Sequence, residues 1–183
     1  DSIQFKEVSF SDQSKLTTYD QAIYQNLVSE VLEDDDELLP EVTIPWPKTD
    51  PPNWIYDRGF NRNAVGRWEM STSQEGSLVV PIRDQHKRMV GWVCRRSPQG
   101  PSPKYVYSSG VKTSKIIFGL YNISMAASSL YITEGPLDAI WLDQHGYSAV
   151  SIFGVTMSAY QQKLLLDSHV SEINLSLDGD VAG

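Results

Sequence analysis

The sequence predicts an α/β protein in which a small mixed α+β subdomain precedes a parallel α/β sheet. Two observations predict this fold class. After residue 129, short apolar runs alternate with helical segments, which is the pattern of a parallel sheet with right-handed crossovers. Between residues 54 and 128, short strand-like runs are separated by polar turns, which is typical of antiparallel strands. We therefore expect three segments, 1–53, 54–128 and 129–183.

The first segment contains one predicted helix, Tyr19 to Leu32, whose apolar residues recur at intervals of three and four. The acidic run Glu33 to Glu37 follows it. Leu38 to Pro52 carries five prolines, a density that excludes regular helix and most sheet, so we interpret it as an extended linker. The acidic run is either a solvated tether or a segment that mimics DNA or inhibits the protein.

The middle segment is predicted to form a small helix and short antiparallel strands. The helix covers Asn61 to Met70. Ser77 to Ile82 and Met89 to Cys94 are predicted strands, joined by the polar turn 83–88. A loop rich in proline, glycine and serine follows. After it comes the run 104–107, which belongs to the same set of short strand-like runs.

The last segment predicts three strands and two helices in alternation. The strands are Leu130 to Thr133, Ala149 to Phe153 and Ile173 to Leu177. The helices are Pro136 to His145, which Gly146 ends, and a second helix that Ser158 caps and that runs to about Asp167.

Charge is distributed unevenly along the 183 residues, of which 15 are Lys or Arg and 23 are Asp or Glu. Residues 1–50 hold 12 acidic and 3 basic residues, residues 51–132 hold 4 and 11, and residues 133–183 hold 7 and 1. The basic middle segment therefore suits a polyanion, although the whole chain is acidic. No apolar run reaches the ~20 residues that span a bilayer, so no membrane partner is expected. The single cysteine, Cys94, excludes an internal disulfide and a cysteine-based zinc site and indicates a reducing compartment.

Four carboxylates follow the predicted strands of the last segment. Glu134 comes directly after the first strand, and Asp138 lies in the first turn of the next helix, where it could also be a simple helix cap. Asp178 and Asp180 flank Gly179 after the third strand. Because ligands bind beyond the carboxyl ends of parallel strands, we expect these acids to converge there. Their mutual repulsion calls for a cation, and a shell of oxygen ligands favours Mg²⁺.

These acids, with Gly135 and the turn at Gly154, resemble the TOPRIM domain shared by DnaG-type primases, topoisomerases and certain nucleases. Sequence upstream resembles the polymerase core of the DnaG-type primases of bacteria and phages, in the same order. The matching stretches are Arg58-Gly59-Phe60, Val80-Pro81-Ile82-Arg83-Asp84, Val90-Gly91-Trp92 with Arg95, Lys104-Tyr105 and Phe118-Gly119-Leu120-Tyr121. The resemblance covers roughly residues 54–183.

The resemblance implies a nucleotidyltransferase that makes short RNA primers on single-stranded DNA from ribonucleotides. It implies Glu134, Asp178 and Asp180 as catalytic residues that, together with Asp138, hold Mg²⁺, for which Mn²⁺ can substitute. The basic and aromatic residues that it implies for nucleic-acid or nucleotide contacts are Arg58, Arg95, Lys104, Tyr105, Lys112 and Lys115. A replicative helicase, separate or fused to the primase, is the expected partner, in the cytoplasm of a bacterium or of a phage-infected host.

The sequence also departs from that family. The zinc-binding template module is absent, so no zinc is expected. The chain begins at Asp1 and ends at Gly183, where the sheet of the family continues, so we expect a piece of a longer polypeptide with a truncated sheet and an incomplete metal site.

Two other functions stay open. A TOPRIM nuclease would need the same carboxylates but not the basic side chains that bind ribonucleotides. A non-catalytic module that binds single-stranded DNA or a replication partner through residues 51–132 would keep its binding after every carboxylate of the last segment is removed.

Overall fold

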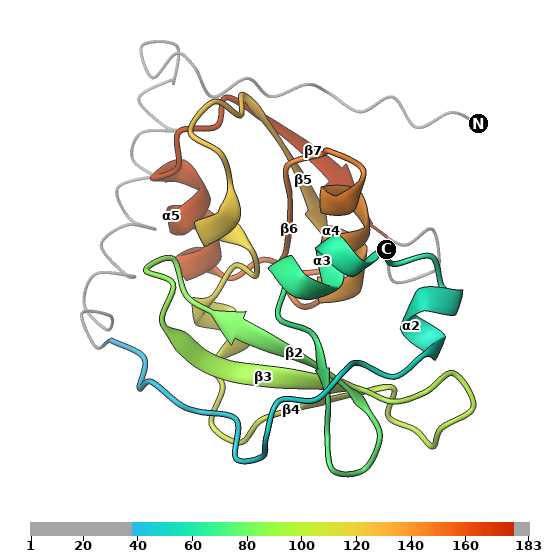
Figure 1. Cartoon of the computed structure of the whole chain (residues 1–183). Helices are drawn as coiled ribbons and strands as arrows, with labels where there is room; N and C mark the ends of the chain where they lie inside the picture. The colour runs from blue at the N-terminus through green and yellow to red at the C-terminus, as the bar shows by residue number, and fades with distance from the viewer. Residues whose placement is uncertain (1–37, 178–183) are drawn as a thin grey trace, which may run out of the picture.

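The computed structural model describes residues 38–177, which form two sheets with helices packed around them (Figure 1). The first sheet is antiparallel and has the order β1-β2-β3-β4. The second is parallel and has the order β6-β5-β7. The predicted architecture, a mixed subdomain followed by a parallel α/β sheet, is confirmed. The predicted helix at 19–32, the acidic run 33–37 and the acids at 178 and 180 lie outside the described residues.

The antiparallel sheet consists of β1 (Ser71–Thr72), β2 (Leu78–Arg83), β3 (Met89–Arg95) and β4 (Tyr105–Tyr107). The strands predicted at 77–82 and 89–94 are therefore correct to within one residue at each end. The central strand β2 is almost wholly buried, because valine, leucine and isoleucine face the core from a strand with a neighbour on each side.

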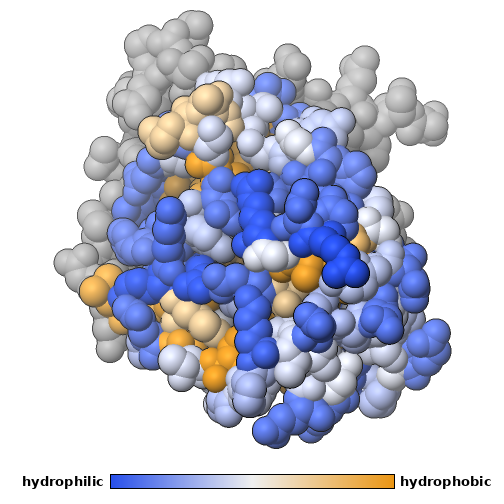
Figure 2. Space-filling view, viewed as in Figure 1, coloured by the Kyte–Doolittle hydropathy of each residue, from blue (hydrophilic) through white to orange (hydrophobic). Residues whose placement is uncertain are grey.

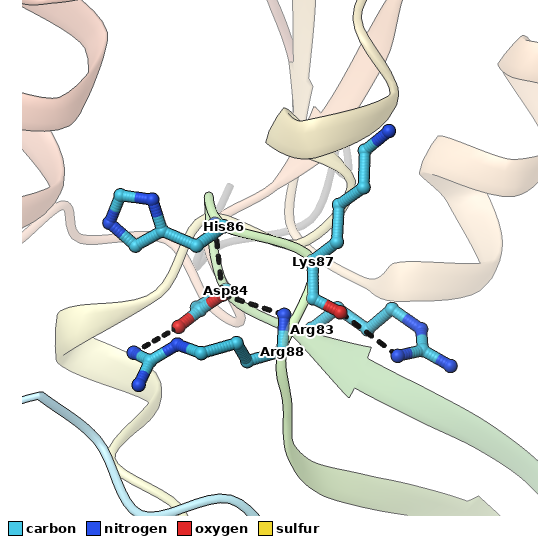
Figure 3. A network of polar contacts seen from close by, with 5 residues as sticks. All are labelled: Arg83, Asp84, His86, Lys87 and Arg88. Carbon is cyan, nitrogen blue, oxygen red and sulfur yellow. Dashed lines mark hydrogen bonds and ion pairs between the residues drawn. The ribbon is translucent and has the colours of Figure 1, made fainter.

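One buried carboxylate holds the turn between β2 and β3 (Figure 3). Asp84 is 2% exposed and accepts hydrogen bonds from the backbone N–H groups of His86 and Arg88, at 2.9 and 3.0 Å. It also pairs with the Arg88 guanidinium. Arg83 donates to the carbonyl of Lys87, a residue whose φ of 67° lies in the left-handed region. The polar turn predicted from its composition is thus fixed by charge-assisted hydrogen bonds.

Residues 38–52 form no helix or strand, as their prolines predicted, yet they lie against the antiparallel sheet. Val42 N–H donates to the carbonyl of Met89 at 2.9 Å. The Trp46 ring meets the Trp92 ring edge-on, with centroids 5.7 Å apart. The linker is therefore a docked strap along this sheet.

The parallel sheet has β5 (Ser129–Thr133) between β6 (Ala149–Ser151) and β7 (Glu172–Ser176). Helix α4 (Pro136–Gln144) connects β5 to β6, and α5 (Ala159–Leu166) connects β6 to β7. All five elements occur where the sequence predicted them. Strand β6 ends two residues earlier than predicted because Phe153 adopts a φ of 63°, which does not continue an extended strand.

Helix α5 begins with the cap that its sequence predicted, and its third residue ties it to the rest of the molecule. Ser158 and Gln161 form a reciprocal capping box. Gln161 is buried, and its side-chain amide donates to the carbonyls of Thr113, Ile116 and Ile152 at 2.9–3.1 Å. One glutamine therefore joins α5, β6 and the short 3₁₀ helix η2 (Thr113–Lys115).

The larger of two hydrophobic clusters in the described residues combines residues of the antiparallel sheet with Leu137, Ile140 and Ala149 from the parallel unit. The second cluster lies within the parallel unit and includes Leu130 and Ile132 of β5. Phe118, which precedes the 3₁₀ helix η3 (Leu120–Asn122), exchanges two backbone hydrogen bonds with Ser151 at the end of β6. The core therefore continues across the boundary between the predicted segments.

Two short helices attach the antiparallel sheet to α4. They are α2 (Trp54–Asp57), which the sequence did not predict, and α3 (Arg62–Arg67), which is shorter than predicted because Glu69 takes a φ of 53°. Between them, Gly59 adopts a φ of 90° and lies against the Trp141 ring of α4.

Hydrophilic side chains dominate the face shown in Figure 2, where apolar side chains form small separate patches. No helix within residues 38–177 has the length and apolar character that crossing a bilayer requires.

Candidate active site

Strand β4 lies across the carboxyl ends of β5 and β6. The Tyr105 hydroxyl is 3.8 Å from the position that a Cβ atom on Gly135, just after β5, would occupy. The Tyr107 ring meets the ring of Phe153, just after β6, with centroids 5.9 Å apart. We call the region bordered by Tyr105, residues 134–138 and residues 151–154 the sheet mouth. It lies where parallel α/β sheets bind their ligands.

Two buried hydroxyls fix the backbone on which Glu134 stands. Ser151 is fully buried, and its Oγ donates to the Glu134 carbonyl at 2.8 Å while it accepts from the Phe153 N–H at 3.1 Å. Thr133 is 1% exposed, and its Oγ1 lies 3.1 Å from the Gly135 carbonyl and 3.0 Å from that of Val150. Side chains of β5 and β6 therefore hold the loop after β5 through hydrogen bonds to its backbone.

Asp138 borders the same loop as Glu134. It stands in the first turn of α4, where the helix dipole favours a negative charge, and its side chain is exposed. Its Oδ2 is only 2.7 Å from the position of a Cβ atom on Gly135. Any side chain at 135 would displace this carboxylate, so the absence of a side chain there keeps the two acids around one short loop.

The basic side of the mouth comes from β3. Arg95 and Tyr105 are direct partners in the β3–β4 ladder, and the guanidinium carbon of Arg95 lies 4.8 Å from the centroid of the Tyr105 ring. One guanidinium nitrogen donates to the Arg96 carbonyl at 3.3 Å. The Nε atom is buried and has no hydrogen-bond partner among the described residues.

The environment of the Tyr105 hydroxyl identifies which charges meet at the mouth. Burial raises the pKa of Tyr105 above its ordinary value of 10.0, and the negative charge of Asp138 adds to the increase. Arg95 and, more weakly, Arg58 act in the opposite direction. The structure therefore brings together residues from the end of α2, from β3, from β4 and from α4, all predicted from sequence.

The other predicted site residues lie elsewhere or outside the described range. Lys104 is exposed immediately before β4. Lys112 is exposed and precedes η2, and Lys115 ends η2, a helix that packs against α5. Asp178 and Asp180 fall outside residues 38–177.

Sequence reasoning missed three positioning groups, the hydroxyls of Thr133 and Ser151 and the side chain of Arg96. The Arg96 guanidinium donates to the carbonyls of Pro101, Ser102 and Pro103 at 3.0–3.4 Å, and its backbone N–H donates to Lys104. It thereby shapes the loop that leads into β4. A polar residue at the end of a buried strand was the available signal for the two hydroxyls.

A separate groove of about 700 Å³ lies between the strap and the short helices. Lys48, Tyr56, Arg62 and Met70 are among its lining residues. None of the predicted site residues lines it, and the chemistry of the strand ends favours the sheet mouth as the candidate active site.

The donors at the mouth suit a hard cation. Glu134 and Asp138 offer carboxylate oxygens, which Mg²⁺ prefers. Within residues 38–177, no three His, Cys, Asp or Glu side chains form a group that could hold a metal ion. The two further predicted acids, Asp178 and Asp180, lie outside that range.

Residues 131–183, which include most of the parallel unit, match the protein family described as Toprim-like. The chain is 29% identical to a DNA primase of Legionella pneumophila over 136 residues, which are 70% of this chain and 21% of that protein. It is 32% identical to a DNA primase of Buchnera aphidicola over 142 residues, 74% of this chain and 22% of that protein. The chain thus spans about a fifth of the length of these relatives.

A solved structure shows the same fold. The DnaG primase catalytic domain bound to single-stranded DNA superimposes with a TM-score of 0.58 at 20% identity, over 72% of this chain and 54% of that one. The predicted resemblance to the catalytic core of DnaG-type primases is therefore confirmed.

Proposed function

We propose that this chain is the catalytic core of a DNA primase and joins ribonucleotides into short RNA primers on a single-stranded DNA template. One observation carries the proposal. In a chain that resembles DNA primases, the Arg95 guanidinium lies over the Tyr105 ring, whose hydroxyl borders the loop between Glu134 and Asp138. Basic side chains that can bind phosphates are thus adjacent to carboxylates that can bind a divalent cation, as transfer of a nucleotidyl group requires.

Glu134 and Asp138, with Asp178 and Asp180 from outside the described range, are the residues that would hold Mg²⁺. Held by these residues, the ion would supply acidification of the attacking 3′-hydroxyl and neutralisation of charge on the reacting phosphate. Ser151 and Thr133 hold the backbone at Glu134 and Gly135 in place. The backbone that carries the carboxylate is therefore already ordered before the reaction begins.

The basic residues bind and orient the substrates. The Arg95 guanidinium can hold phosphate oxygens in a bidentate manner, and Arg58 adds positive charge at the same place. Lys104, exposed at the start of β4, and Lys112 and Lys115 around η2 extend the basic surface for the template strand. The similar primase domain with bound single-stranded DNA supports this choice of template.

The remaining expectations belong to the same proposal. The chain works in the cytoplasm of a bacterial or phage-infected cell, beside a replicative helicase or fused to one. Its segments are the acidic residues 1–53, the basic subdomain 54–128 and the TOPRIM subdomain 129–183, with Mn²⁺ able to replace Mg²⁺ and no zinc in the chain.

Incorporation of labelled ribonucleotides on single-stranded DNA with Mg²⁺ or Mn²⁺ tests the proposal. Short RNA products are expected from the unmodified chain, and their loss is expected in Glu134→Gln and in Asp178→Asn/Asp180→Asn. Asp167→Asn is the matched control, because Asp167 is an exposed acid of the same unit whose carboxylate pairs only with Lys163 among the described residues.

Two outcomes would overturn the proposal. Metal-dependent cleavage of the DNA without RNA synthesis would favour the nuclease. DNA binding without either reaction, unchanged after removal of all four acids, would favour a binding module.

A further inference from the structure

We infer that Tyr105 is a positioning residue that holds the Arg95 guanidinium at the sheet mouth for the triphosphate of the incoming ribonucleotide. The inference rests on the proposed function and assigns to Tyr105 an action through Arg95, in place of direct stacking on a base.

Arg95 and Tyr105 are neighbours on one face of the antiparallel sheet. The two residues are paired across β3 and β4, so their side chains leave the same face of the sheet, and the guanidinium covers one face of the ring at 4.8 Å from its centroid. The opposite end of the side chain, the hydroxyl, lies against the loop at Gly135. The tyrosine therefore stands between the arginine and the loop of the two carboxylates.

Arg95 has few hydrogen-bond partners among the described residues. Its guanidinium has five N–H donors, but no carboxylate of residues 38–177 forms an ion pair with it. Its guanidinium donates to the Arg96 carbonyl, and Nε is buried without a partner in this range. A half-buried cation with few acceptors favours an anionic ligand, and a triphosphate supplies several oxygens in the geometry that a guanidinium fits.

Arginine side chains are long and flexible. Without a fixed neighbour, the guanidinium would sample many rotamers, and ordering it on binding would weaken the affinity for the ligand. The ring restricts Arg95 before the nucleotide arrives. A phenylalanine would keep that contact, whereas leucine would fill the space without attracting a cation.

The test is a double-mutant cycle on the affinity of the full chain for ATP, measured without Mg²⁺ by competition with a fluorescent analogue. Tyr105→Leu and Arg95→Ala should each weaken binding about tenfold, and the double variant should be no weaker than Arg95→Ala alone. Tyr105→Phe should stay within about threefold of the unmodified chain. Should Tyr105→Leu not fold, Tyr105→Met fills the space and replaces it.

Tyr107→Leu is the matched control. Tyr107 lies on the same face of β4, but its ring packs on Phe153, so its effect should be additive with that of Arg95→Ala. The ¹⁵N–¹H signal of Arg95 Nε gives a second readout: a ring-current shift in the unmodified chain and in Tyr105→Phe that Tyr105→Leu abolishes.

The outcomes separate the inference from the proposed function. Additive losses for Tyr105→Leu and Arg95→Ala, or no ATP binding by the unmodified chain, would overturn the inference. The absence of RNA synthesis from a chain that binds ATP with the expected coupling would overturn the proposed function alone.

Discussion

Replacing Ser151 by alanine removes one hydroxyl from beneath the loop that carries Glu134. That hydroxyl is fully buried and bridges two loops, since it donates to the Glu134 carbonyl and accepts from the Phe153 N–H. In Ser151→Ala both backbone groups lose this partner. Leaving a buried polar group unsatisfied costs about 1–3 kcal/mol, and partial access of water to the half-buried loop reduces the sum. We expect the free energy of unfolding to fall by about 2 kcal/mol.

Ser151→Ala should also slow RNA synthesis. The Glu134 backbone becomes free to move by a fraction of an ångström, and we expect kcat for RNA synthesis to fall about tenfold. KM for the ribonucleotide should change little, because the basic side chains proposed to bind the triphosphate lie on the other sheet. Urea denaturation and steady-state incorporation assays measure the two effects.

Ser171→Ala is the control for this prediction. The Ser171 hydroxyl also donates to a backbone carbonyl, that of Ser128, at 3.1 Å, but at an exposed position. It should change the free energy of unfolding by less than about 0.5 kcal/mol. If Ser151→Ala behaved like Ser171→Ala in both assays, the argument that this hydroxyl positions Glu134 would be refuted.

Three further predictions follow from other parts of the structure. Asp84→Ala should lower the free energy of unfolding by about 3 kcal/mol in chemical denaturation, because it leaves the Arg88 guanidinium and two turn N–H groups without their acceptor; a loss below 1 kcal/mol would contradict this. Gly59→Ala should lower the melting temperature, since φ is 90° and the new Cβ would lie 2.9 Å from the Trp141 ring; an unchanged melting temperature would disprove that contact. Burial raises the pKa values of Tyr105, Tyr107 and Tyr121 above the ordinary 10.0, because the folded state favours the neutral phenol. The stabilisation from these neutral phenols is complete below pH 10 and is lost as the pH rises through the raised pKa values. The urea midpoint should therefore fall above about pH 10, and a constant midpoint would count against buried phenols.

The sequence was most informative where the pattern is local. Short apolar runs with helical segments between them placed β5, α4, β6 and α5, and Ser158 with the residue three positions later marked the start of α5. The carboxyl ends of these strands then predicted that Glu134 and Asp138 border one loop. Both conclusions depend on residues a few positions apart.

Features that depend on distant residues could not be predicted. Helix α2 is only four residues long and has no periodicity to detect. The docking of the strap depends on contacts such as Trp46 with Trp92, 46 positions apart in the sequence. Tyr105 was expected to contact nucleic acid, but its place between Arg95 and Gly135 depends on how two sheets pack.

The continuous core beneath the two sheets limits how the chain can be recombined. Trp68, just after α3, donates to Asp143 of α4, and Arg67 of α3 forms an ion pair with the same carboxylate. Gly59 lies against the Trp141 ring of α4. A chimera that takes residues 54–128 from a relative would therefore need the matching face of α4 as well. The two segments are distinct in charge and in sheet type, but they pack as one unit.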